Sequence, residues 1–201
     1  MDLFAAQALT LSIQRYGQNE RTLFSFLEAT GQGSLQSFVE GKHTTYSLAD
    51  VYDYDIYNFY SYLSEINADS AAWTSIRVSL ERVEGLFEGD IATAAIALVK
   101  TIGMINLFGK AGVQLDKKAL SVYARTALGI NTPGDIIDLL TQHKIIRYAT
   151  YKSQYILFEG TDVNIEGELL KAAGIVPRSK DVIDKLLTNF NLPIEFANAS
   201  Y

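Results

Sequence analysis

The chain has 201 residues, of which 48% are apolar and 11% aromatic, which is enough for a hydrophobic core and argues against disorder. It contains no cysteine, so disulfides and thiolate zinc sites are excluded. Its two histidines, His43 and His143, lie too far apart in sequence to form a spaced metal motif. Residues 1–4 lack the basic region of a secretory signal, so the expected location is the cytoplasm.

The net charge of −6 is distributed unevenly along the chain. Residues 1–110 carry a net charge of −6, residues 111–160 a net charge of +2, and residues 161–201 a net charge of −2. Duplex DNA carries one negative charge per ~1.7 Å, so a surface that binds it should be strongly basic. The charge pattern is therefore a weak signal for nucleic-acid binding.

Apolar residues at helical spacing predict a bundle of about five helices before the middle of the chain. These helices are expected at residues 3–16 and 20–29, in a short segment after Ser34, from Ser47 onward, and from Asp69 or Ser70 onward. The expected buried face of the second helix consists of Leu23, Phe24, Phe26 and Leu27.

The helix that begins at Ser47 is unusually rich in aromatic residues. Ser47 and Asp50 form a capping-box-like pair at its start. Its aromatic residues fall on several faces: Tyr52, Tyr54, Tyr57, Phe59, Tyr60 and Tyr62. They predict a helix packed between neighbours, with some aromatic surface left for another helix or another part of a longer chain. Helical spacing puts Asp53 and Asp55 on different faces, so we interpret them as solvated carboxylates rather than as an acid-base pair.

Residues 91–108 are apolar enough to be tested as a membrane span. Lys100 lies near the middle, where a lysine costs roughly 2.5 to 3.5 kcal/mol on insertion, and Asn106 adds to that cost. The better interpretation is a buried core helix at the centre of the bundle. The glycines near the end of this segment do not form a P-loop. Their spacing differs from that of a P-loop, and a phosphate binds at the start of a helix rather than at its end.

Residues 111–160 carry the signals of a winged helix. The predicted elements are, in order, a helix from Asp116 to Gly129, a helix that opens at Thr132 and Pro133, and strands at residues 145–151 and 155–158 around the connection Lys152, Ser153 and Gln154. Helix, turn, helix and hairpin is the order of a winged helix.

A winged helix that reads DNA places its second helix in the major groove and presents basic or amide side chains there. The outward positions here are mostly Asp135, Asp138, Thr141 and Gln142. Two carboxylates would repel phosphates, so we expect this unit to face protein. The hairpin region still offers three basic residues as phosphate contacts: Lys144, Arg147 and Lys152.

Residues 161–201 are expected to form one or two closing helices and an extended tail. The tail stops at Tyr201 without a helix end or a charged finish, as though a longer chain had been cut. No serine or threonine has an arguable base beside it, so no catalytic residue is assigned, and His143 is explained by the dipole of its helix. An enzyme acting by itself is the least supported class.

Several short sequence segments match one protein family in the same order along almost the whole chain. They are residues 17–27, 46–54, 99–103, 107–109, 155–163 and 192–193. Together they resemble a family of large bacterial P-loop ATPases of the AAA+ or STAND-like kind, ATP-binding proteins that are sometimes linked to phage defence. In that family the matching region follows the nucleotide-binding core and consists of a helical lid and a winged helix. The resemblance implies that ATP and magnesium belong to the parent protein and that this chain itself holds no cofactor.

The same resemblance suggests a nucleotide-sensing role for Arg21, because AAA+ lids place an arginine near a helix start against the terminal phosphates. The alternative is that Arg21 and Asn19 only cap and solvate the end of their helix.

These observations predict a mainly α-helical fold with a lid-like helical bundle over residues 1–110, a winged helix over residues 111–160, and closing helices over residues 161–201. The expected function is regulatory: a non-catalytic region that transmits the nucleotide state of an attached ATPase core to downstream domains through protein contacts. The alternative is a winged-helix regulator that binds nucleic acid, a partner that we disfavour. No membrane partner is expected.

Overall fold

The computed structural model describes residues 1–158 except residues 19, 29–32, 41–44, 65–67 and 110–114. The elements are α1 (Leu3–Tyr16), α2 (Glu20–Glu28), α3 (Leu35–Glu40), α4 (Leu48–Ser64), α5 (Ser70–Leu86), α6 (Gly89–Phe108), α7 (Lys117–Thr126), α8 (Pro133–Gln142), β1 (Ile146–Ala149) and β2 (Gln154–Leu157). The prediction of a mainly helical fold is confirmed. The helices expected beyond residue 160 lie outside the described residues.

All of the described residues belong to one compact unit, called the first unit below. The finer division of the first unit at residue 110 stays a prediction.

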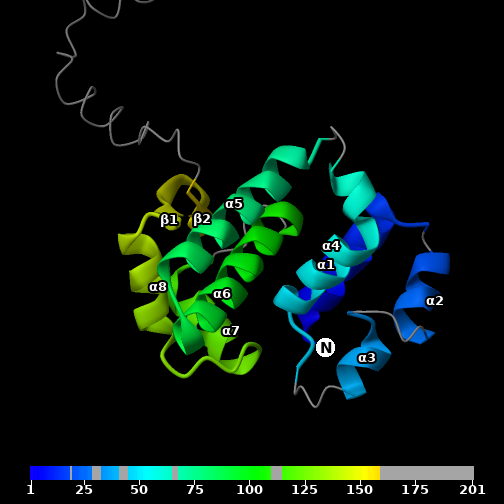
Figure 1. Cartoon of the computed structure of the whole chain (residues 1–201), viewed down its shortest axis with the longest axis horizontal. Coiled ribbons are helices and arrows are strands. Elements are labelled where there is room, and N and C mark those ends of the chain that lie inside the picture. The colour runs from blue at the N-terminus through cyan, green and yellow to red at the C-terminus, as the bar shows by residue number, and fades with distance from the viewer. Residues whose placement is uncertain (19, 29–32, 41–44, 65–67, 110–114, 159–201) are drawn as a thin grey trace, which may run out of the picture. The chain divides into compact units, whose positions relative to one another are not determined.

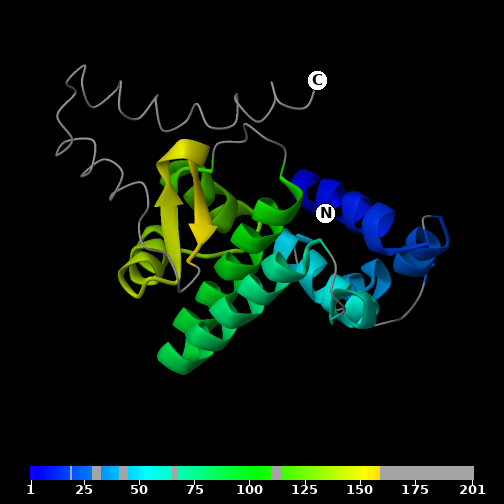
Figure 2. The ribbon, with the colours of Figure 1, turned by 90° about the horizontal axis from the view of Figure 1, so that it is seen from above.

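Helix α6 is the central element of the first unit, as predicted. It packs against α1, α4 and α5 and also against α8 and β2, so it lies between the amino-terminal helices and the hairpin (Figures 1 and 2). Leu98, Val99 and Ile102 are fully buried on it. At Gly103 a Cβ atom would lie 2.5 Å from Cγ1 of the buried Ile76, so glycine lets α5 and α6 approach closely.

Among the described helices, α6 is long and apolar enough to cross a membrane by length and composition. Its lysine is bound inside the bundle. Lys100 Nζ donates to both carboxylate oxygens of Asp53 on α4, over 2.6 and 2.8 Å, and lies 5.4 Å from the centre of the Tyr52 ring. These contacts fit the predicted core helix.

An aromatic cluster joins α1, α4, α5 and α6. The Tyr16 ring contacts the rings of Phe59, Trp73 and Phe108. The Tyr16 hydroxyl donates to Asp69 over 2.8 Å and accepts from the Trp73 indole over 3.1 Å. Burial raises the pKa of Tyr16 to about 12, so the hydroxyl stays protonated at physiological pH.

The prediction that α4 packs between neighbours agrees with the burial of Tyr52, Tyr54 and Phe59. Tyr57 remains exposed, as expected for an aromatic helix with residues on several faces. The side chains of Tyr60 and Tyr62 lie outside the described residues.

Only part of the predicted buried face of α2 is correct. Phe26 is buried, and its ring meets those of Tyr46 and Tyr54 at centroid distances of 5.5 and 5.1 Å. The remaining residues of that face are exposed: Leu23, Phe24 and Leu27. The reason is that α2 packs on the short helix α3 and reaches the start of α4 through Phe26, so a narrow stripe is covered.

The prediction that Asp55 is solvated is wrong. Asp53 and Asp55 do lie on different faces of α4, but Asp55 is fully buried, because α4 is covered on more than one side. Ser12 Oγ on α1 donates to Asp55 Oδ1 over 2.9 Å, and Asp55 Oδ2 has no hydrogen-bond partner among the described residues. Burial raises the pKa of Asp55 well above its usual range, and the Ser12 hydrogen bond offsets this only in part.

The predicted caps of α7 and α8 are largely confirmed. The Asp116 carboxylate accepts from the Ala119 amide over 2.7 Å, and Pro133 lies in the first turn of α8. Thr132 occupies the cap position of α8 without a side-chain hydrogen bond. Helix α7 ends at Thr126, earlier than predicted, and Gly129 has the positive φ of 68° expected for it.

The hairpin is antiparallel, with Ile146 opposite Leu157 and Tyr148 opposite Tyr155. Strand β1 is shorter than predicted, because residues 150–152 form a 3-10 turn and Ser153 adopts φ 51°. Strand β2 has the predicted length but begins one residue earlier, at Gln154. Leu115 pairs beside the hairpin: its amide donates to the Ser153 carbonyl, and its carbonyl accepts from the Tyr155 amide, both over 3.1 Å.

The Asp55→Asn variant should be more stable than the native protein at neutral and alkaline pH, by a margin that grows with pH. The folded state raises the pKa of Asp55 above its unfolded value, so the folded protein holds more protons between the two values. Native stability therefore falls as pH rises through that window, by up to about 1.4 kcal/mol per pH unit. Urea unfolding from about pH 4 to about pH 9 measures the margin.

The matched control is Glu81→Gln, which removes an exposed carboxylate on α5 that has no ion pair among the described residues. A margin for Asp55→Asn that stays constant or shrinks as pH rises contradicts the assignment of a buried neutral acid.

Candidate functional site

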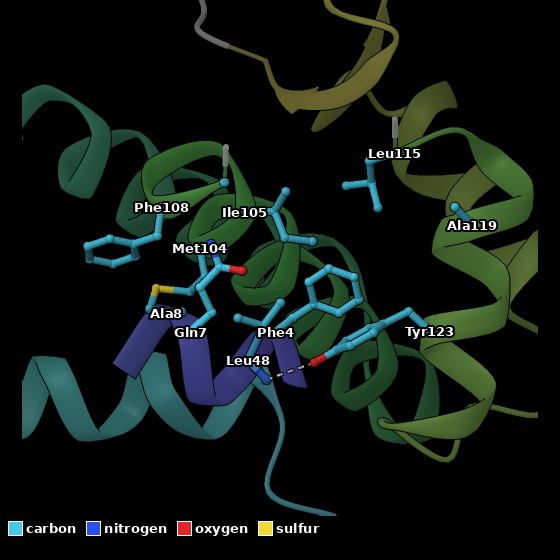
Figure 3. A pocket seen from close by; sticks show the side chains of 11 residues that line it. Phe4, Gln7, Ala8, Leu48, Met104, Ile105, Phe108, Leu115, Ala119 and Tyr123 are labelled. Carbon is cyan, nitrogen blue, oxygen red and sulfur yellow. Dashed lines mark hydrogen bonds between the residues drawn. The ribbon is translucent and has the colours of Figure 1, made fainter. Parts of the chain in front are cut away.

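A mainly apolar groove lies between the amino-terminal end of α1 and α7, with the start of α4 and the end of α6 as its floor (Figure 3). Its inner part is a hollow of about 120 Å³. The lining residues are Phe4, Gln7, Ala8, Leu48, Met104, Ile105, Phe108, Gly109, Leu115, Ala119 and Tyr123. Most of them are apolar, so the hollow can accept a hydrocarbon or aromatic group.

A second, more open hollow of about 500 Å³ continues along α7. It shares Phe4, Ala119 and Tyr123 with the inner one, so the two form one groove. The residues that it adds are Asp116, Lys118, Val122 and Thr126. The groove thus has an apolar interior and a polar rim.

Tyr123 of α7 is hydrogen-bonded to the starts of the two other helices at the groove, α1 and α4. Its hydroxyl donates to Asp2 Oδ2 over 2.7 Å and accepts from the Leu48 amide over 2.9 Å (Figure 3 shows the second bond). The Leu48 amide is at the first position of α4, where no partner exists within the helix. Burial, aided by the neighbouring Asp2 carboxylate, raises the pKa of Tyr123 well above its usual range, so its hydroxyl keeps the proton that it donates.

Asp2 fixes the other wall of the groove. Its Oδ1 accepts from the Ala5 amide over 2.9 Å and so caps α1, while its own amide donates to the Tyr46 carbonyl over 3.0 Å. One carboxylate therefore caps a helix with one oxygen and holds Tyr123 with the other. The start of α1, the start of α4 and the middle of α7 are joined at this point.

The rim of the groove exposes apolar side chains. Phe4, which is 48% exposed, and Val122, which is 53% exposed, both line the groove. Leu3, next to Phe4, is 81% exposed, and it lies outside the buried face of α1, which consists of residues 5, 8, 9, 12 and 13. Leu3 is at the first position of α1 and points away from that face, so its side chain is left at the surface.

Charged side chains of α7 lie at the outer hollow and beside it. Lys118 lines the hollow and Arg125 lies on the same face of α7; both are exposed, and no ion pair to either is found among the described residues. The neighbouring Lys117 is paired with Asp138 over 2.5 Å. The Asp116 carboxylate, at the start of α7, also lines the hollow and caps the helix.

The predicted nucleotide sensor does not take part in this groove. Arg21 is exposed on α2, and its carbonyl accepts from the Ser25 hydroxyl over 3.0 Å. Asn19 lies outside the described residues. Arg21 is not among the residues that line the groove.

The three predicted phosphate contacts are spread along the hairpin. Lys144 precedes β1, and Lys152 lies in the turn after it, so the four residues of β1 separate them. Arg147 lies within β1 and is half-buried. Lys152 Nζ lies 5.5 Å from the centre of the exposed Tyr151 ring. The three basic residues are therefore spaced along the hairpin.

The outward positions of α8 agree with prediction: Asp135, Asp138, Thr141 and Gln142 are exposed. His143 follows the helix and meets the Phe87 ring edge-on at 5.2 Å. Arg82 on α5 donates to the His143 and Lys144 carbonyls over 3.0 and 2.9 Å, which satisfies the end of α8. Within the described part of the chain, no three His, Asp or Glu side chains gather as a metal site would require.

Comparisons of the chain with family models, curated proteins and solved structures found no match.

Sequence reasoning did not find the groove. Asp2 carries a recognisable cap signal before the helix at residues 3–16, but Tyr123 lies 121 residues away in sequence. A tyrosine on an amphipathic helix has no local signature for a distant hydrogen bond. The pairing depends on tertiary structure and becomes visible only there.

Tyr123→Phe should lower the free energy of unfolding by about 1 to 3 kcal/mol, because the buried Leu48 amide and one Asp2 oxygen lose their partner while the ring remains. The matched control is Tyr151→Phe, which removes a hydroxyl from a 61% exposed tyrosine and should change stability by less than about 0.5 kcal/mol. Urea unfolding of the three proteins measures both effects. Equal stability of the two variants would contradict the role given to the Tyr123 hydroxyl.

Proposed function

We propose that this chain is a non-catalytic coupling region of a larger cytoplasmic P-loop ATPase, which passes the nucleotide state of the ATPase core to other domains through protein contacts. The main support is the apolar groove between α1 and α7, whose lining includes the partly exposed side chains of Phe4 and Val122. Exposed large apolar side chains around a hollow are typical of protein interaction sites. ATP and magnesium would then be bound by the parent protein.

A second exposed apolar face supports the same role. Leu23, Phe24 and Leu27 are between 44% and 59% exposed on one amphipathic helix, α2. These three residues are on the helix that carries Arg21. A domain that covered the apolar face of α2 would therefore lie close to this arginine, as the proposed sensing role requires.

The packing offers a route between the two ends of the unit. Helix α6 contacts α1 and α4 on one side and α8 and β2 on the other. Arg82 links α5 to the end of α8, and Tyr123 links α7 to the starts of α1 and α4. Because these elements share one core, a shift of α1 would be transmitted to α7 and the hairpin.

The finer architecture that we propose is a winged helix made of α7, α8, β1 and β2, with α6 as the preceding helix. The element order supports this proposal, as do the backbone hydrogen bonds by which Leu115, before α7, is joined to Ser153 and Tyr155 of the hairpin region. The acidic outer surface of α8 favours a unit that faces protein.

The alternative function is a winged-helix regulator that binds nucleic acid. It is favoured by Lys152 and the exposed ring of Tyr151 at the turn of the hairpin, since a cation next to an aromatic ring suits a phosphate and a base. Against it stand Asp135 and Asp138 on α8 and the spread of Lys144, Arg147 and Lys152.

The purified chain should show no salt-sensitive binding to labelled duplex DNA near physiological salt. Two or three separated phosphate contacts give a weak affinity that falls steeply with salt concentration. Fluorescence anisotropy with the native chain and with Lys152→Glu measures this. A clear anisotropy increase that Lys152→Glu abolishes would favour the nucleic-acid regulator over the coupling region.

The reading frame of the gene gives an independent test, because the proposal requires a P-loop encoded in the same polypeptide. In that parent protein, Arg21→Ala should impair ATP hydrolysis or its coupling to output, whereas Arg77→Ala, at an exposed site on α5, should not. Normal hydrolysis and coupling in the Arg21→Ala protein would rule out the sensing role.

A further inference from the structure

We propose that the groove between α1 and α7 binds one amphipathic helix of a partner segment, which places large apolar side chains in the groove and acidic side chains against its rim. This inference rests on the proposed protein-contact function and names the chemistry of the partner.

The size of the inner hollow suits one side chain rather than a whole small molecule. The inner hollow measures about 120 Å³. Sites that enclose a drug-sized ligand usually measure about 300 to 1,000 Å³. A hollow of this size fits a single leucine or phenylalanine side chain. The outer hollow of about 500 Å³ is open along α7, where the body of a helix can lie.

The apolar rim continues the inner surface. Phe4 and Ala119 line both hollows, while Val122 lies one turn further along α7 on the outer one. A helix laid in this groove would bring side chains at positions i, i+3 and i+4 to these residues in turn, which is the usual arrangement of a helix bound in an apolar groove. The residue in the inner hollow would be its central anchor.

Charge complementarity defines the flanks of the partner. Lys118 and Arg125 lie four residues before and three residues after Val122, so all three share one face of α7. The Asp116 and Asp2 carboxylates accept hydrogen bonds from neutral groups of α7, α1 and Tyr123, and neither forms an ion pair with Lys118 or Arg125 among the described residues. Aspartate or glutamate on the partner would meet these two cations.

A second copy of the chain is a poorer occupant. A symmetric dimer through this groove would bring Lys118 and Arg125 of both copies into one interface. Like charges facing each other across an interface weaken binding.

The test uses the full chain and three labelled synthetic peptides of about 18 residues, long enough to form a helix. One carries leucine and phenylalanine on one face with glutamate on its flanks. The second has lysine in place of every glutamate, and the third has alanine in place of the apolar anchors. Fluorescence anisotropy should show binding of the acidic peptide at least about fivefold tighter than that of the other two.

Two sets of variants locate the binding site. Ala119→Arg fills the groove at an exposed position without adding negative charge, and it should weaken binding of the acidic peptide by about tenfold or more. The double variant Lys118→Glu and Arg125→Glu should weaken it about fivefold and reverse the preference toward the lysine peptide. Lys144→Glu, at an exposed site beyond the groove, is the matched control and should bind as the native chain does. Circular dichroism verifies that each variant is folded.

Equal binding of the acidic and basic peptides, or acidic-peptide binding that Ala119→Arg leaves unchanged, would overturn the inference. Concentration-dependent dimers in sedimentation that Ala119→Arg abolishes would also overturn it, because the occupant would be a second copy. The proposed coupling function fails separately: DNA binding through Lys152, or a gene without a P-loop, would refute that function while leaving peptide binding in the groove intact.

Discussion

The hydroxyl of Tyr123 is the contact on which the arrangement of the two ends of this unit depends. It donates to Asp2 and accepts from the first amide of α4, so one side chain of α7 satisfies groups at the starts of two other helices. Each of those groups would be costly to bury unpaired. The same contact holds α7 beside α1 without closing the space between them, and the apolar groove is the result.

Helix α6 makes that contact part of a wider core. It is apolar on almost every side because other elements cover it from both directions, and this explains why its composition resembles a membrane span. Its one lysine is neutralised by Asp53 of α4, and Gly103 lets Ile76 of α5 pack against its backbone. A helix with so many neighbours cannot move independently of them, which suits a region proposed to transmit a conformational change.

The sequence predicted what depends on local chemistry and missed what depends on distant partners. The caps at Asp116 and Pro133 and the core helix around Lys100 follow from neighbouring residues, and the structure has them. The exposure of Phe24 and the burial of Asp55 could not be predicted, because helical periodicity shows that a helix has faces but not which of them is covered. Tyr123 was missed for a related reason, since its hydrogen-bond partners are far from it in the chain.

The free energies of apolar burial and of exposed charge pairs explain why the surface of this unit suits a protein partner better than a nucleic acid. Full burial of a valine or phenylalanine side chain stabilises a complex by roughly 1.5 to 3 kcal/mol, and Phe4 and Val122 in the groove are each about half exposed. Burying the remaining area of these two side chains therefore provides about 2 kcal/mol before any anchor enters the inner hollow. Exposed charge pairs provide about 0.2 to 1 kcal/mol each, less as salt rises, and the basic residues of the hairpin are few and separated. The apolar groove can therefore contribute more binding free energy than the hairpin, while Lys118 and Arg125 at its rim select among apolar partners by charge.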